Sequence, residues 1–135
     1  MADFNDTPTT RISRLSGRNG RALAASDVAL SAGFGDTATV AVATGNSETA
    51  FQLTITCGGT GQGASPTATV TFPGGAWRDA SGATIVPIAT TSRGTGTTQP
   101  TIQFQATCTA TTCVLTFTGT ASGSEVYVVN VRVSA

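Results

Sequence analysis

Histidine and lysine are both absent from this 135-residue chain. Histidine is the commonest general base, so neither a Ser-His-Asp nor a Cys-His catalytic site can be built without it. A pair of carboxylates could replace it, but the seven acidic residues are scattered along the sequence over expected turns and the N-terminal segment. These absences predict that the protein is not an enzyme and uses no cofactor.

Long hydrophobic runs are also missing. No stretch approaches the roughly 20 apolar residues that cross a bilayer as a helix. The opening residues, MADFNDTPTT, lack the basic start and apolar core of a signal peptide. We therefore expect synthesis in the cytoplasm and no membrane partner. The odd number of cysteines, three, agrees with this, because a secreted disulfide scaffold carries paired cysteines.

Charge is scarce and unevenly distributed. Only 10% of the residues are charged, about half the usual share, which favours a surface that is covered in an assembly. Residues 1–26 carry four arginines against two aspartates, whereas residues 27–135 carry three arginines against five acidic residues. A basic segment that precedes a slightly acidic body is typical of an arm.

Residues 1–31 are expected to form this extended arm, because they show no period-two pattern and contain Gly17, Asn19 and Gly20. Its basic and apolar side chains would bind a partner: Arg11, Ile12, Arg14, Leu15, Arg18, Arg21 and Leu23. That partner is either an acidic protein surface or nucleic acid. Nucleic acid is the less favoured of the two, since no aromatic residues alternate with the arginines.

The stretch 101–118 alternates apolar and polar residues, as a half-buried β-strand does. The apolar positions before the turn are Ile102, Phe104, Ala106 and Cys108, and those after it are Cys113, Leu115 and Phe117. Two such runs joined by a few small polar residues predict a β-hairpin.

The same alternation predicts further strands at 37–43, 50–57, 67–72, 83–90 and 126–133. Pro87 makes the fourth of these an edge strand or a bulged strand, since proline has no N–H to donate to a neighbouring strand. Segments 58–66 and 92–100 are expected to be loops, the first of them flexible. The pattern predicts an all-β protein: an antiparallel β-sandwich, jelly-roll or immunoglobulin-like, of about seven or eight strands over residues 32–135.

All three cysteines fall on the apolar parity of their predicted strands, which favours small core residues. Three thiols without histidine also fall short of the four ligands of a structural zinc site, so we expect no metal. A disulfide is the alternative for Cys108 and Cys113. If residues 109–112 form a four-residue loop, these two cysteines face each other across the hairpin, and a bridge would form after release from the reducing cytoplasm.

Trp77 is the only tryptophan and is followed by Arg78 and Asp79. Exposed in a turn, its ring would stack on a sugar or form a contact hot spot; otherwise it covers a small core. In a ligand-binding protein, Trp77, Arg78 and Arg93 would contact the ligand. The glycines of 58–63 do not form a phosphate loop, because neither a lysine nor a helix follows them.

Several short motifs follow one another in a recognisable order: Ala32-Gly33-Phe34-Gly35, a turn at Gly45-Asn46, Ala68-Thr69-Val70-Thr71-Phe72, Ala76-Trp77, a Thr-rich hairpin and a final strand with Tyr127. This order resembles the small β-sandwich domains of tailed-bacteriophage virion proteins, which occur in head decoration (cement) proteins and in tail-fibre tips. The likeness covers roughly residues 32–133. It implies a virion surface role without enzymatic activity.

The resemblance implies two competing roles. A domain with a basic arm and no fibrous shaft favours a capsid decoration protein: a homotrimer on the outer capsid surface that binds the major capsid protein and stabilises the head. Deletion of residues 1–26 would then abolish capsid binding and leave the body folded. The alternative is a receptor- or carbohydrate-binding domain of a tail fibre or adhesin.

Overall fold

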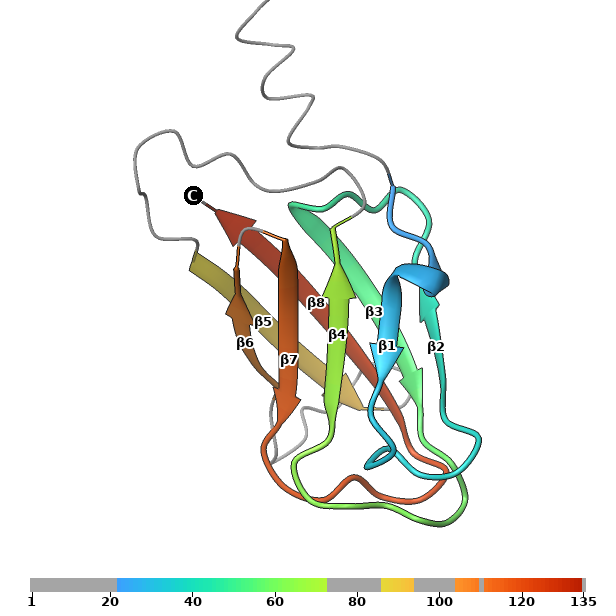
Figure 1. Cartoon of the computed structure of the whole chain (residues 1–135). Helices are drawn as coiled ribbons and strands as arrows, with labels where there is room; N and C mark the ends of the chain where they lie inside the picture. Colours follow the sequence, from blue (N-terminus) through green and yellow to red (C-terminus); the bar gives the residue numbers. More distant parts are fainter. Residues whose placement is uncertain (1–21, 73–85, 94–103, 110, 135) are drawn as a thin grey trace, which may run out of the picture.

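The structure, a computed structural model, describes residues 22–72, 86–93, 104–109 and 111–134. Eight strands form two antiparallel four-stranded sheets that pack face to face (Figure 1). The strands are β1 (Val28–Leu30), β2 (Thr39–Val42), β3 (Ala50–Thr56), β4 (Thr67–Thr71), β5 (Val86–Arg93), β6 (Phe104–Cys108), β7 (Thr112–Phe117) and β8 (Val126–Ser134), preceded by a short 3-10 helix, η1 (Ala25–Asp27). The predicted all-β antiparallel sandwich is confirmed.

The strand order is β1-β4-β7-β6 in one sheet and β2-β3-β8-β5 in the other. The first order corresponds to immunoglobulin strands A, B, E and D, and β5 and β8 take the places of C and F. On the other side of β8 from β5 lies β3. In the sequence, β2 and β3 form an extra pair of strands between β1 and β4, the strands in the A and B positions. Tyr127, near the start of β8, occupies the place of the immunoglobulin tyrosine corner, since its hydroxyl accepts the Ser122 N–H at 3.3 Å.

Alternate side chains of the strands fill the space between the two sheets, as the period-two pattern predicts. In β3 and β8 the buried set is Phe51, Leu53, Ile55, Tyr127, Val129, Val131 and Val133. Three aromatic rings from β6, β7 and β8 pack together, with centroid separations of 5.0 Å for Phe104 and Phe117 and 4.8 Å for Phe117 and Tyr127. Burial of these apolar surfaces is the main force that holds the sheets together.

Two local predictions from the sequence are confirmed by the strand pairing. The stretch 101–118 contains a hairpin, in which β6 and β7 pair from Phe104↔Phe117 to Cys108↔Cys113. Pro87 lies in β5, which is an edge strand of its sheet. The first two residues of the expected loop at 92–100 belong instead to β5, which extends to Arg93, and residues 94–100 lie outside the described residues.

The predicted arm of residues 1–31 is wrong for its last ten residues, which belong to the sandwich. Val28–Leu30 pair with β4 in the register Val28↔Val70, and Leu23 is only 4% exposed within the hydrophobic core. A three-residue strand is too short to produce a visible alternation. Deletion of residues 1–26 would therefore remove a core side chain, and a cut that spares the body has to fall before Leu23. Residues 1–21 lie outside the described residues.

The prediction that 58–66 is a flexible loop is also wrong, since its backbone is hydrogen-bonded to that of residues 33–36. The Asp36 N–H donates to the Thr60 carbonyl at 2.8 Å, the Gly58 N–H to Phe34 at 3.0 Å, and the Gly63 N–H to Gly33 at 3.0 Å. Glycine is needed where these backbones approach most closely, because a Cβ at Gly58 would overlap the Asp36 carbonyl oxygen. The loop is therefore bonded to residues 33–36 of the folded body by backbone hydrogen bonds.

Candidate functional site

The outward side chains of the β2-β3-β8-β5 sheet form a broad surface, which we call the open face. Along β8 the outward residues Asn130 and Arg132 are exposed, while Val129 and Val131, which alternate with them, are buried. Register places Gln52 and Thr90 on either side of Asn130, and Ala50 and Ile88 on either side of Arg132. Two adjacent rows across three strands thus present amide, hydroxyl, guanidinium and aliphatic groups together.

Apolar exposure on the open face is concentrated at Ile88, which is 61% exposed. Among the described residues, it is the only large hydrophobic side chain that is strongly exposed. Arg132 carries the only charge among the described outward side chains of these four strands. A sheet surface with so little charge opposes close contact with another protein only weakly. An exposed isoleucine adds apolar area that such a contact would bury.

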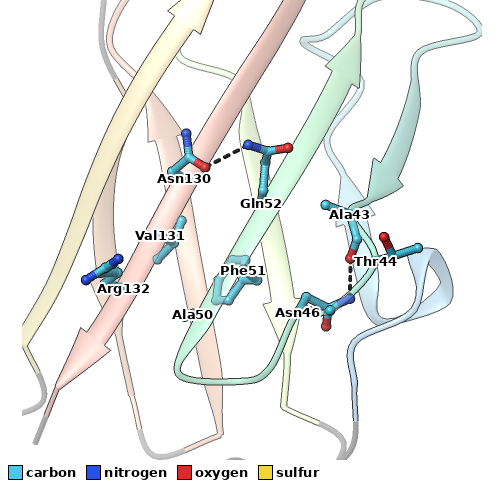
Figure 2. A pocket seen from close by; sticks show the side chains of 10 residues that line it. Ala43, Thr44, Asn46, Ala50, Phe51, Gln52, Asn130, Val131 and Arg132 are labelled. Carbon is cyan, nitrogen blue, oxygen red and sulfur yellow. Dashed lines mark hydrogen bonds between the residues drawn. The ribbon is translucent and has the colours of Figure 1, made fainter.

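A shallow groove opens at the end of this face, where the chain turns from β2 into β3 (Figure 2). It is lined by Ala43, Thr44, Gly45, Asn46, Ala50, Phe51, Gln52, Asn130, Val131 and Arg132, and its volume is about 230 Å³. Figure 2 shows the Gln52 and Asn130 amides above it, joined by a hydrogen bond of 2.8 Å from Gln52 Nε2 to Asn130 Oδ1. Small-molecule sites usually enclose about 300–1,000 Å³, so this groove suits a single side chain better than a whole ligand.

Asn46, at the wall of the groove, holds the segment through which the chain enters the sandwich. Its Oδ1 accepts the Leu23 N–H at 2.6 Å, and its Nδ2 donates to the Leu23 carbonyl at 3.2 Å. The same Nδ2 donates to the Ala43 carbonyl at 2.6 Å. One amide side chain thus pairs with both backbone groups of Leu23, as a neighbouring strand would, and it holds Leu23 beside the groove.

We expect Asn46→Ala to lower the free energy of unfolding by about 1–3 kcal/mol, because two buried or half-buried backbone groups at Leu23 lose their partner. Asn46→Asp should cost at least as much, since a carboxylate would face the Leu23 and Ala43 carbonyl oxygens. Urea unfolding, with hydrogen exchange at the Leu23 amide, measures both effects. Thr44→Ala, an exposed neighbour, is the matched control and should unfold like the unmodified protein. Equal stability of all variants would contradict the role of Asn46.

The two cysteines proposed for a disulfide lie opposite each other, as predicted, and both are free thiols here. Cys113 is fully buried and Cys108 is partly exposed. A hydrogen bond between the two thiols lowers the pKa of Cys108, and the same bond together with burial raises the pKa of Cys113 far above its ordinary value. Burial, with the Glu125 carboxylate nearby, raises the pKa of Cys57, which is the expected core residue.

Of the other predicted site residues, two lie elsewhere in the sandwich and the rest lie outside the described residues. Leu23 is in the core, and Arg93 lies in β5 in register with Tyr127 rather than in a loop. Trp77, Arg78 and the remaining arm residues lie outside the described residues: Arg11, Ile12, Arg14, Leu15, Arg18 and Arg21. The open face and groove are formed by other residues, among them Gln52, Asn130 and Ile88. In the sequence these residues carry no signal of a site, because they are ordinary outward positions of strands.

Within the described ranges, no three histidine, cysteine, aspartate or glutamate side chains gather closely enough to hold a metal ion. The described part of the chain also contains no helix long and apolar enough to cross a membrane. Comparison with protein-family models finds no matching family, and neither the curated proteins nor the solved structures include a match.

Proposed function

We propose that this chain is a structural protein of a virus particle, a capsid decoration protein that binds the outer capsid lattice through its open face and its basic N-terminal segment. The open face is the single observation that carries the proposal. It combines a nearly uncharged sheet surface with one strongly exposed isoleucine, Ile88, and a groove of side-chain size. These features suit repeated contact with a protein surface.

Charge indicates the chemistry of the partner. Arg132 on the open face and four arginines in residues 1–21 favour an acidic or polar surface on the major capsid protein. Asn46 holds Leu23 beside the groove, so the basic segment is attached to the body next to the surface that we propose binds the capsid. A homotrimer at the lattice three-folds, as the resemblance implies, would place three such segments around one capsid position.

The second candidate is a receptor- or carbohydrate-binding domain of a tail fibre or adhesin. The paired amides of Gln52 and Asn130 beside Arg132 favour it, because amide and guanidinium groups donate to sugar hydroxyls. Against it, Phe51, the only aromatic residue of the groove lining, is just 4% exposed and offers no ring for stacking. The described part of the site therefore favours protein contact.

The test is binding to capsids, purified from the source particle and stripped of this protein, measured by co-sedimentation. Ile88→Glu should weaken binding at least tenfold, because it places a second charge where apolar area would be buried. A chain that lacks residues 1–21 should also bind less well, yet remain folded because Leu23 is retained. Thr107→Glu, on the exposed outer side of β6 in the opposite sheet, is the control and should bind normally.

Immunoelectron microscopy of the intact particle separates the two candidates. Antibody label on the head supports decoration, whereas label confined to the tail, together with a positive glycan array, supports the receptor-binding alternative. Absence of label from every particle would overturn both.

A further inference from the structure

The end of the β6–β7 hairpin places two cysteines in a geometry that suits a covalent bond. Thr109 and Thr112 form a hydrogen-bonded pair, since the Thr109 N–H donates to the Thr112 carbonyl at 2.8 Å. In an antiparallel ladder such pairs alternate with non-hydrogen-bonded pairs, so Cys108 and Cys113 occupy a non-hydrogen-bonded position. Cα atoms at that position are about 4.5 Å apart, within the range of about 4.4–6.8 Å that a disulfide spans.

The surroundings of the two sulfur atoms differ in a way that assigns them different chemical roles. Cys108 is partly exposed at the last position of the edge strand β6, whereas Cys113 is completely buried on β7. The thiol of Cys113 hydrogen-bonds to Cys108, which favours the thiolate of Cys108. A reagent from solvent can therefore reach Cys108 but not Cys113, and Cys108 is the stronger candidate for the attacking thiolate.

We propose that Cys108 and Cys113 form a disulfide-forming site, in which a small-molecule disulfide such as oxidised glutathione reacts at Cys108 and Cys113 completes the bridge. The site does not depend on the proposed capsid role. Cys57, buried directly after the end of β3 in the other sheet, takes no part.

The reaction is balanced as two thiol–disulfide exchanges. The Cys108 thiolate attacks one sulfur of oxidised glutathione, forms a mixed disulfide and releases one glutathione thiolate. The Cys113 sulfur, as its proton is lost, then attacks the Cys108 sulfur and releases the second glutathione. The protein thiols are oxidised by two electrons, and the two glutathione molecules leave reduced.

The bridge would act on the hairpin end rather than on the whole fold. It closes a loop of only a few residues, so it restricts the unfolded chain little. The same hairpin end is also bonded to the chain just after β4, since the Phe72 N–H donates to the Thr111 carbonyl at 2.9 Å. Without the disulfide, only non-covalent contacts hold the end of the β6–β7 hairpin together. Oxidation would therefore slow the local opening of this hairpin end, and hydrogen exchange at the Thr109 amide should slow severalfold.

The test is incubation of the folded full-length protein with oxidised glutathione, followed by intact-mass spectrometry and alkylation after denaturation. The expected product has lost two hydrogen atoms and takes up one alkyl group instead of three, and peptide mapping joins Cys108 to Cys113. Three alkylated thiols after prolonged incubation, or a mixed disulfide on Cys108 that never closes, would overturn the proposal.

Single variants identify the order of the two steps. Cys113→Ser should stop at one glutathione attached to Cys108, and Cys108→Ser should not react while folded. Cys57→Ala should be oxidised like the unmodified protein. If Cys108→Ser instead takes up glutathione on Cys113, the assignment of roles is wrong. Peptide mapping of the unmodified chain keeps the proposal testable if a variant does not fold.

Discussion

Replacement of Gly58 by alanine is expected to destabilise the protein by about 3 kcal/mol or more, or to prevent folding. The new Cβ would overlap the backbone of Asp36, and a backbone cannot move aside as a flexible side chain can. Three hydrogen bonds hold the Gly58 peptide where it is: its N–H to Phe34 at 3.0 Å, and its carbonyl from Ser124 N–H at 2.8 Å and Gln62 Nε2 at 2.6 Å. Relief of the overlap would have to break some of them.

The neighbouring glycine supplies a matched control. At Gly59 a Cβ would meet only the Ser124 hydroxyl, at an ordinary 3.9 Å, so Gly59→Ala should change stability by no more than about 0.5 kcal/mol. Urea denaturation followed by circular dichroism compares the two variants. If Gly58→Ala unfolds at the same urea concentration as Gly59→Ala, the packing of loop 58–66 against 33–36 is not as described.

Phe117→Ala is expected to cost about 3–5 kcal/mol, as removal of a buried aromatic ring generally does. Phe117 is 1% exposed, and its ring lies 5.0 Å from that of Phe104 and 4.8 Å from that of Tyr127. The substitution would leave a cavity between β6, β7 and β8, which connect the two sheets through the core. Loss of the ring pairs adds to the loss of buried area.

Thermal and urea unfolding measure this loss, and Thr107→Ala is the control on the same hairpin. Thr107 is exposed on the outer side of β6, so its replacement should leave stability within about 0.5 kcal/mol. Phe117→Leu should fall between the two, because leucine fills part of the cavity. A Phe117→Ala variant as stable as Thr107→Ala would contradict the central place of this ring in the core.

The strands and their buried faces could be predicted from the sequence because burial on one side produces a period of two. Phe51, Leu53 and Ile55 in β3 follow this rule, as does the β6–β7 hairpin. Pro87 marked an edge strand for a similarly local reason, its missing N–H. Each of these features depends on residues close to one another in the chain.

Features that depend on distant contacts could not be predicted in this way. β1 has only three residues and is recognisable as a strand only when paired with β4. Loop 58–66 is rich in glycine, which in sequence indicates flexibility; here glycine instead permits close contact with 33–36.

The candidate site shows the same division. The position of Cys108 opposite Cys113 could be predicted, because only a short loop separates them in the sequence. Gln52 and Asn130 are 78 residues apart and become neighbours only because β8 lies beside β3. Nothing in the local sequence of either residue indicates that pairing, so the open face and its groove appear only in three dimensions.

Among the eight strands, the one made last on the ribosome occupies an interior position: β8 separates β3 from β5 in its sheet. While β8 is still inside the ribosomal exit tunnel, β5 has no partner in that sheet, and the β3 edge of the β2–β3 hairpin is unpaired. The pairing of β8 with β3 and with β5 must therefore wait until translation has passed residue 134. Until then Phe51, Leu53 and Ile55 remain uncovered by β8, so the sandwich completes its folding only after β8 has left the ribosome, and molecular chaperones can bind these apolar side chains in that interval.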